Sequence, residues 1–148
     1  MVMALVLFFG GCSRINLADP SPLLSGGRLN VEVSASSGLN QAQPLAFDLL
    51  VVYDERLLET LEEMDAATWF KNRKQFLADQ SRKKNVEAHH WEWVPGQPKL
   101  MLELHFKRHA RGGVAFANYL SVGAHRSHFD PFKDLLVNLG GKGFALVQ

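Results

Sequence analysis

Residues Leu29–Ser36, LNVEVSAS, alternate strictly between apolar and polar side chains. This period of two is typical of a β-strand with one buried face. A polar turn, Ser37–Gln43, follows, and Pro44 then opens a more continuously apolar segment, Leu45–Tyr53. Such a run predicts a strand in the middle of a sheet, with Asp48 as its odd polar residue. We therefore expect the folded part of the chain to start with two strands.

The period becomes helical between Asp54 and Lys84. Leucines recur at helical spacing first, and Asp65 is the expected N-cap of a second helix. We interpret the segment as two amphipathic helices with solvated charged faces, in preference to a specific phosphate or partner site. The second helix carries an apolar stripe of Trp69, Phe70, Phe76 and Leu77, and a basic face of Lys71, Arg73, Lys74, Arg82, Lys83 and Lys84.

Strand patterns resume after the helical segment. The predicted strands are Val86–Val94, Lys99–Lys107, Val114–Val122 and Gly143–Val147. The first two read as a hairpin across the turn Pro95–Pro98. Ala124–Asp134 reads as a loop, with a short helical turn near Phe132–Leu136. Six strands with one helical insertion between the second and the third predict a mainly β protein, folded as a β-sandwich.

The N-terminal stretch Val2–Cys12, VMALVLFFGGC, is a short apolar run that ends in two glycines and the only cysteine of the chain. It is too short to cross a bilayer, which takes about 20 residues, and it fits the apolar region of a signal peptide. We interpret residues 1–11 as a lipoprotein signal peptide, Cys12 as the lipidated residue, residues 12–28 as a flexible tether and residues 29–148 as the β-sandwich domain. The alternative is a buried first strand in which Cys12 is only a small apolar residue.

Size and composition set broad limits on function. A chain of 148 residues fits one domain with its own core. A net charge of +1 with 21% charged residues excludes a disordered chain and gives no sign of a nucleic-acid binder. A single cysteine leaves no disulfide framework.

Candidate catalytic and metal-binding residues are few. The chain has no Gly-x-Ser-x-Gly elbow and no Walker phosphate loop, so we predict no enzyme. His125 and His128 could supply two ligands of a metal site, but spacing specifies no third. His89 and His90 are expected on opposite faces of their strand. Glu92 and Glu103 would form a carboxylate pair across the predicted hairpin, and Trp91 and Trp93 would share one face as core residues.

Several motifs follow one another in a recognisable order. A cysteine after small residues and a polar tether precede LNQAQPLAFDLLVVYD, a helical insertion and WEWVPGQ. This order resembles the TssJ (SciN/VasD) family, the outer-membrane lipoproteins of the type VI secretion membrane complex. The matching positions within Leu29–Leu120 are Pro44-Leu45, Tyr53, Trp93, Pro95-Gly96 and Gly113-Val114-Ala115.

The resemblance implies a transthyretin-like β-sandwich, anchored by lipid at the periplasmic face of the outer membrane. Such a protein is non-catalytic, needs no cofactor beyond the covalent lipid on Cys12, and binds the periplasmic region of the inner-membrane subunit TssM. The resemblance places that contact in the loop between the first two strands, which holds Ser37, Gly38, Leu39, Asn40, Gln41, Ala42 and Gln43. Two alternatives stay open: a periplasmic lipoprotein that binds a metal or small ligand, and a pilotin-like lipoprotein of another secretion machine.

Overall fold

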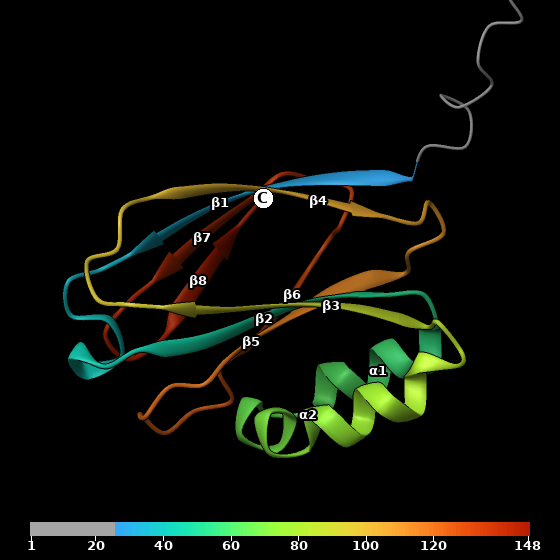
Figure 1. The fold of residues 1–148 in the computed structure, drawn as a ribbon, viewed down its shortest axis with the longest axis horizontal. Coiled ribbons are helices and arrows are strands. Elements are labelled where there is room, and N and C mark those ends of the chain that lie inside the picture. The colour runs from blue at the N-terminus through green and yellow to red at the C-terminus, as the bar shows by residue number, and fades with distance from the viewer. Residues whose placement is uncertain (1–25) are drawn as a thin grey trace, which may run out of the picture.

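The computed structural model describes residues 26–148 (Figure 1). The predicted signal peptide, Cys12 and the predicted tether up to residue 25 lie outside the described residues. A short 3-10 helix, Leu39–Ala42, lies between the first two strands. In chain order the other elements are β1 (Gly27–Ala35), β2 (Leu45–Val52), α1 (Glu55–Glu63), α2 (Ala66–Ser81), β3 (Val86–Trp93), β4 (Leu100–Phe106), β5 (Gly112–Ala117), β6 (Arg126–Phe129), β7 (Leu135–Leu139) and β8 (Phe144–Val147).

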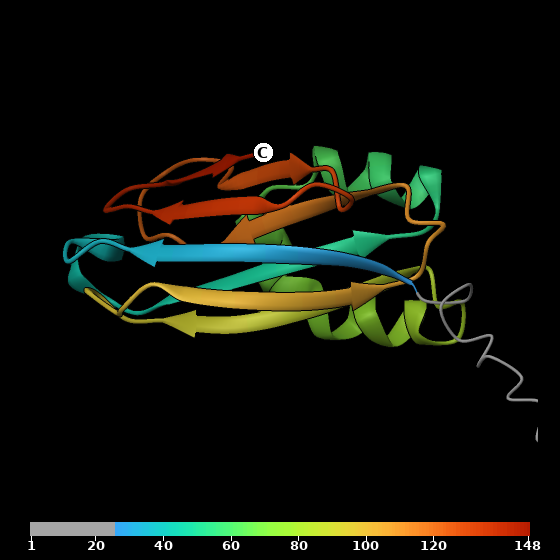
Figure 2. The ribbon, with the colours of Figure 1, turned by 90° about the horizontal axis from the view of Figure 1, so that it is seen from above.

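The strands form two four-stranded sheets that face each other (Figures 1 and 2). The first sheet has the order β4-β1-β7-β8 and the second has the order β3-β2-β5-β6. All neighbours are antiparallel except β1 and β7, which run parallel. The two helices cover the outer face of the second sheet (Figure 1). The predicted mainly β fold, a β-sandwich with a helical insertion between the second and third strands, is confirmed.

Strand β2 is buried on both of its faces, which explains why its sequence is almost continuously apolar. Its residues Leu49 and Val51 pack into the core between the two sheets. Leu50 and Val52 point the other way, into a second core between the sheet and the helices. The helical insertion is therefore a third layer of the domain.

Two aspartates begin the two helices. Asp54 accepts a hydrogen bond from the backbone N–H of Leu57 at 2.9 Å, and Asp65 accepts one from Thr68 at 2.7 Å. These bonds satisfy N–H groups that have no partner inside the helix. The bonds from Thr68 also lower the pKa of Asp65 below its usual range. The predicted N-cap at Asp65 is confirmed.

The predicted hairpin between the third and fourth strands is wrong. β3 pairs with β2 in the second sheet, whereas β4 pairs with β1 in the first. The turn around Pro95 and Gly96 therefore crosses from one sheet to the other. Alternation of side chains predicts a strand but says nothing about its neighbour, so this error could not be seen in the sequence.

The last third of the chain holds two strands that the sequence analysis missed. β6 lies inside the segment predicted as a loop, and β7 includes Leu135 and Leu136, which were expected in a helical turn. The strand predicted to run to Val122 ends at Ala117. β1 begins at Gly27, two residues before the predicted start. Within residues 26–148, neither helix has the length and hydropathy needed to cross a membrane.

Candidate functional site

Four loops meet at the end of the sandwich opposite the start of β1 (Figure 1). We call them the distal loop cluster: residues 36–44, 94–98, 118–125 and 140–143. Hydrogen bonds join neighbouring loops. The N–H of Gly96 donates to the carbonyl of Ser36 at 3.0 Å, and the hydroxyl of Ser121 donates to the carbonyl of Lys142 at 2.8 Å. The cluster is thus one connected surface and not four separate loops.

Asn40 lies at the centre of this network. Only 2% of the residue is exposed. Its side-chain amide donates to the carbonyl of Pro44 at 2.9 Å, and its Oδ1 accepts the backbone N–H of Leu120 at 2.8 Å. Its own N–H donates to the carbonyl of Gly140 at 3.2 Å. One buried residue, through its side chain and its backbone, therefore ties three of the four loops together.

The backbone of this loop is strained. Asn40, Gln41 and Ala42 have φ values of 45°, 58° and 62°, in the left-handed region. Asparagine tolerates this conformation, but other side chains with a Cβ pay an energetic penalty for it. Strain of this kind persists only where the surroundings enforce it, and it is common at functional sites. Here the N–H of Gln41 is held by the carbonyl of Gly141 at 3.2 Å.

The seven residues predicted to contact a partner divide into two groups. Leu39 and Asn40 are buried, so they support the loop and present no surface to a partner. The remaining residues are exposed: Ser37, Gly38, Gln41, Ala42 and Gln43. The structure thus limits the predicted contact to the exposed group.

The surface around this loop carries one fixed charge and is partly apolar. Lys142 is the only Lys, Arg, Asp or Glu in the distal loop cluster. Val94, Leu120 and Val122 are exposed, and the side chain of Val122 is completely so. The last two were predicted as strand residues, and no local signal in the sequence shows that β5 ends at Ala117.

Two hollows flank the cluster. One of about 560 Å³ lies beside the ends of β1, β7 and β8, and Ser36, Leu139 and Gly140 line part of it. The other, of about 270 Å³, lies between the start of α2 and the 118–125 loop, with Leu120 and Val122 in its lining. An exposed, rigid loop between two hollows has the shape of a protein docking surface more than that of an enclosed ligand pocket.

Tyr119 and His125 stiffen the 118–125 loop. The Tyr119 hydroxyl donates to the carbonyl of Gly143 at 2.8 Å, and burial raises the pKa of this tyrosine to about 12. The His125 ring packs on the Tyr119 ring, with centroids 4.8 Å apart, and its Nε2 lies 2.8 Å from the carbonyl oxygen of Ser121. His125 therefore has a structural partner within its own loop.

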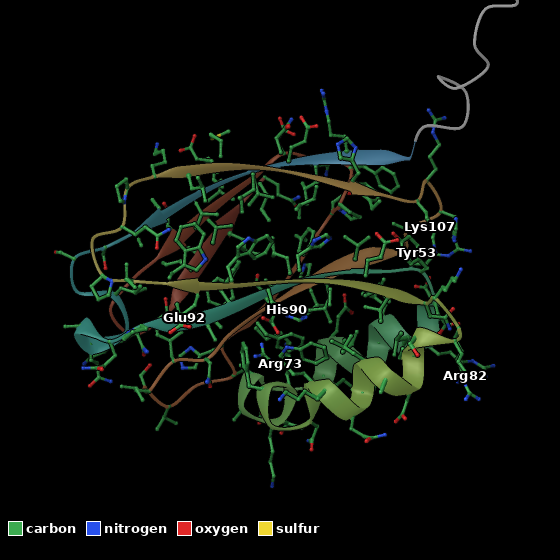
Figure 3. The ribbon with its side chains drawn as sticks, viewed as in Figure 1. Tyr53, Arg73, Arg82, His90, Glu92 and Lys107 are labelled. Carbon is green, nitrogen blue, oxygen red and sulfur yellow. The ribbon has the colours of Figure 1, made fainter. Side chains whose placement is uncertain are left out.

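A second polar cluster lies under the helices, around Asp48. This carboxylate is completely buried and accepts hydrogen bonds from Trp69 Nε1 at 2.7 Å and from Arg73 Nη1 at 3.0 Å. His90 Nδ1 lies 2.9 Å from it (Figure 3). Arg73 was expected on a solvated basic face, and this expectation is wrong because the helix turns it toward β2. Every approach to the carboxylate is occupied, so the cluster holds α2 on the sheet and offers no reaction site.

The other residues considered as catalytic or metal-binding candidates do not lie close together. His89 and His90 lie on opposite faces of β3, as predicted: His90 reaches Asp48, while His89 stacks on Trp91 and burial lowers its pKa. Glu92 and Glu103 lie in different sheets, so the expected pair across a hairpin is wrong. Across residues 26–148, no three His, Cys, Asp or Glu side chains gather closely enough to hold a metal ion.

Comparison with known proteins gives matches in structure alone. No protein-family profile and no curated protein sequence matches the chain. Among solved structures, the T6SS lipoprotein TssJ1 from Pseudomonas aeruginosa superimposes with a TM-score of 0.63 at 20% identity, over 82% of this chain and 95% of that one. The chain has the fold of the TssJ lipoproteins. The resemblance to this family seen in the sequence is thereby confirmed at the level of the fold.

Two further solved structures superimpose on this chain about as well as TssJ1 does. Serratia marcescens Lip, described as a membrane-bound component of the type VI secretion system, gives a TM-score of 0.61 at 15% identity, over 83% of this chain and 98% of Lip. A chain of the structure described as the T6SS protein TssM C-terminal domain from EAEC gives 0.58 at 12% identity, over 82% and 98% of the two chains. All three matches span nearly the whole of the matched chain, so the common fold is that of a complete domain.

Proposed function

We propose that this chain is a TssJ-family lipoprotein of a type VI secretion membrane complex. It is anchored in the outer membrane by a lipid on Cys12, with the sandwich in the periplasm. It binds the periplasmic region of a TssM-like inner-membrane subunit and catalyses no reaction. The observation that carries the proposal is the likeness of its whole fold to TssJ1 and to Lip, both of which are T6SS proteins.

The distal loop cluster supports a binding role. A surface with one fixed charge and with exposed Val94, Leu120 and Val122 loses little hydration energy when a partner covers it. The hydrogen bonds of Asn40 hold the loops in one conformation, so binding requires little further ordering. The structure whose description names TssM supports the choice of partner. A buried, fully bonded Asp48 supports the non-catalytic role.

Binding to the partner is tested with the purified chain and the periplasmic region of the TssM-like protein from the same organism. The double variant Ser37→Arg/Gln43→Arg adds two long charged side chains to the exposed part of the loop. We expect the Kd to rise at least about tenfold. The matched control, Gln75→Arg/Ser81→Arg, makes the same kind of change on the exposed face of α2 and should leave the Kd unchanged. Equal affinities for both double variants would refute the assigned surface.

The anchor is tested separately in cells. Mass spectrometry of the protein extracted from membranes should find an acylated Cys12 as the first residue. Cys12→Ser should abolish palmitate labelling and release the domain from the outer-membrane fraction. A wild-type chain that carries no acyl group would refute the anchor, whatever its affinity for the partner.

A further inference from the structure

The two ends of the sandwich differ sharply in charge. Gly27, the first residue of β1, pairs with Phe106, the last residue of β4. Val52 ends β2 and pairs with both Val86 and Gly112, which begin β3 and β5. The loop after α2 and the loop between β4 and β5 therefore lie at the end of the domain where β1 begins (Figure 1).

These two loops are strongly basic. Residues 82–84 read RKK and residues 107–111 read KRHAR, which gives six fixed positive charges and no carboxylate. We call them the basic loop pair. Lys107 joins them, because its Nζ donates to the carbonyl of Lys84 at 3.5 Å. It also lies 4.9 Å from the centre of the Tyr53 ring and 4.0 Å from Glu87 (Figure 3). The distal loop cluster, in contrast, has one fixed charge.

A hollow and an exposed aromatic ring lie beside the basic loop pair. The hollow, of about 560 Å³, is lined by Gly26, Phe106 and Lys107 among others. Phe132 is 54% exposed and packs edge-on against Phe106, with ring centroids 5.3 Å apart. Phe106, which Phe132 contacts, directly precedes Lys107, so an exposed aromatic ring and cationic side chains occur at the same end, as on surfaces that rest at a membrane interface.

The carboxylates near Phe132 already have partners. Asp134 accepts a hydrogen bond from the side chain of Asn30 at 2.9 Å. Asp130 lies 3.5 Å from Lys133 and accepts the N–H of Phe132 at 3.0 Å. The charges of Asp130 and Lys133 offset each other, so Asp134 and Glu87 are the carboxylates set against the six positive charges of the basic loop pair, and this end keeps a net positive charge.

We propose that the basic loop pair docks on anionic phospholipid headgroups of the membrane that holds the lipid on Cys12. This proposal rests on the lipid anchor of the proposed function. The 15 residues from Cys12 to Gly26 are joined by 14 peptide bonds and cannot extend farther than about 50 Å. The anchor therefore keeps this end of the domain near the headgroups, where even weak attraction becomes effective.

Docking at this end orients the whole domain. The basic loop pair and the distal loop cluster lie at opposite ends of the strands (Figures 1 and 2). With its basic end on the membrane, the sandwich stands upright and presents the distal loop cluster away from the lipid, toward a partner that approaches across the periplasm. Lipid charge thus controls access to the partner-binding surface.

The first experiment uses the acylated chain in vesicles that contain either phosphatidylglycerol or only phosphatidylcholine. We expect backbone hydrogen exchange at residues 82–85 and 107–111 to be slower on the anionic vesicles, and exchange at residues 118–125 to be equal on both. The difference should vanish in 1 M salt, where charges are screened within about 3 Å. Equal exchange of the basic loop pair on both vesicles would overturn the proposal.

The second experiment removes the anchor, so that docking and anchoring are measured apart. In a full chain carrying Cys12→Ser, the triple change Arg82→Gln/Lys83→Gln/Lys84→Gln should lower partitioning onto phosphatidylglycerol vesicles. Each basic residue near such a surface contributes roughly a fivefold factor, so the expected loss is about 100-fold. The matched control is Lys71→Gln/Lys74→Gln/Lys99→Gln, whose lysines are also exposed and lie outside both the basic loop pair and the distal loop cluster, and it should keep wild-type partitioning.

The outcomes separate the two proposals. Equal partitioning of both triple variants would overturn membrane docking and leave the anchor intact. An unacylated Cys12 in cells would overturn the anchor, while the vesicle measurement would still decide whether the basic loop pair binds anionic lipid.

Discussion

Replacement of Asn40 by alanine tests how the distal loop cluster is held together. The side chain of Asn40 makes two hydrogen bonds, to Pro44 and Leu120, and its backbone adopts a left-handed φ of 45°. Alanine removes both side-chain bonds and tolerates a left-handed backbone less well than asparagine does. The change therefore removes the link between loops and increases the backbone strain at the same time.

The expected loss of stability in Asn40→Ala follows from these two contributions. A hydrogen bond of this kind stabilises a protein by about 0.5–1.5 kcal/mol net, so the loss of two costs about 2 kcal/mol. The left-handed backbone adds roughly 1 kcal/mol for alanine. Asn40→Ala should thus lower the free energy of unfolding by about 3 kcal/mol. Asn40→Gly avoids the backbone penalty and should lower it by only about 2 kcal/mol.

Urea unfolding followed by tryptophan fluorescence measures both changes, since Trp69 and Trp93 are buried. Gln43→Ala is the matched control, because its side chain is exposed and its φ of −117° is ordinary extended backbone. We expect the control to stay within about 0.5 kcal/mol of the wild type. A loss below about 1 kcal/mol for Asn40→Ala would refute the central role of this side chain. Equal losses for alanine and glycine would refute the strain argument.

Three further predictions concern the rest of the domain. Asp48→Ala leaves the indole N–H of buried Trp69 without an acceptor. It should lower the free energy of unfolding in urea by about 3 kcal/mol, more than Trp69→Phe does. A loss below about 1 kcal/mol would contradict this prediction. Burial lowers the pKa of His89, so the folded state favours its neutral form. The free energy of unfolding should therefore be at its full value above pH about 6.5 and fall as the pH drops below that value. His89→Gln should flatten this slope, and an unchanged slope would count against the argument. Val122→Asp, at a fully exposed position, should weaken partner binding at least about tenfold at unchanged thermal stability, and unchanged binding would exclude Val122 from the interface.

Part of the candidate site could be predicted from the sequence. The resemblance pointed to residues Ser37–Gln43, and the structure places this loop at the centre of a surface formed by four loops. The sequence could not predict that Asn40 is buried, because its burial depends on contacts with Gly140 and Leu120, far away in the chain. Exposed Leu120 and Val122 were read as strand residues for the same reason. Apolar character predicts burial on average, and only the surroundings decide it.

The sequence by itself determined the type of most elements, because alternation, helical spacing and N-caps are local properties of the backbone. It specified β1, the central strand β2, both helices with the Asp65 cap, β3 to β5 and β8, apart from a few residues at their ends. Short β6, with the sequence RSHF, has no such pattern and went unrecognised. Its pairing with β5 supplies the hydrogen bonds that make it a strand.

Only the tertiary structure decided which elements meet. It placed β3 and β4 in different sheets, laid β7 parallel to β1, and turned Arg73 from an apparently solvated helix face toward Asp48. It also separated the charges, with the basic loop pair at one end and the distal loop cluster, which has one fixed charge, at the other. Residues that are distant in sequence form these surfaces, and the direction in which each strand runs brings their loops together.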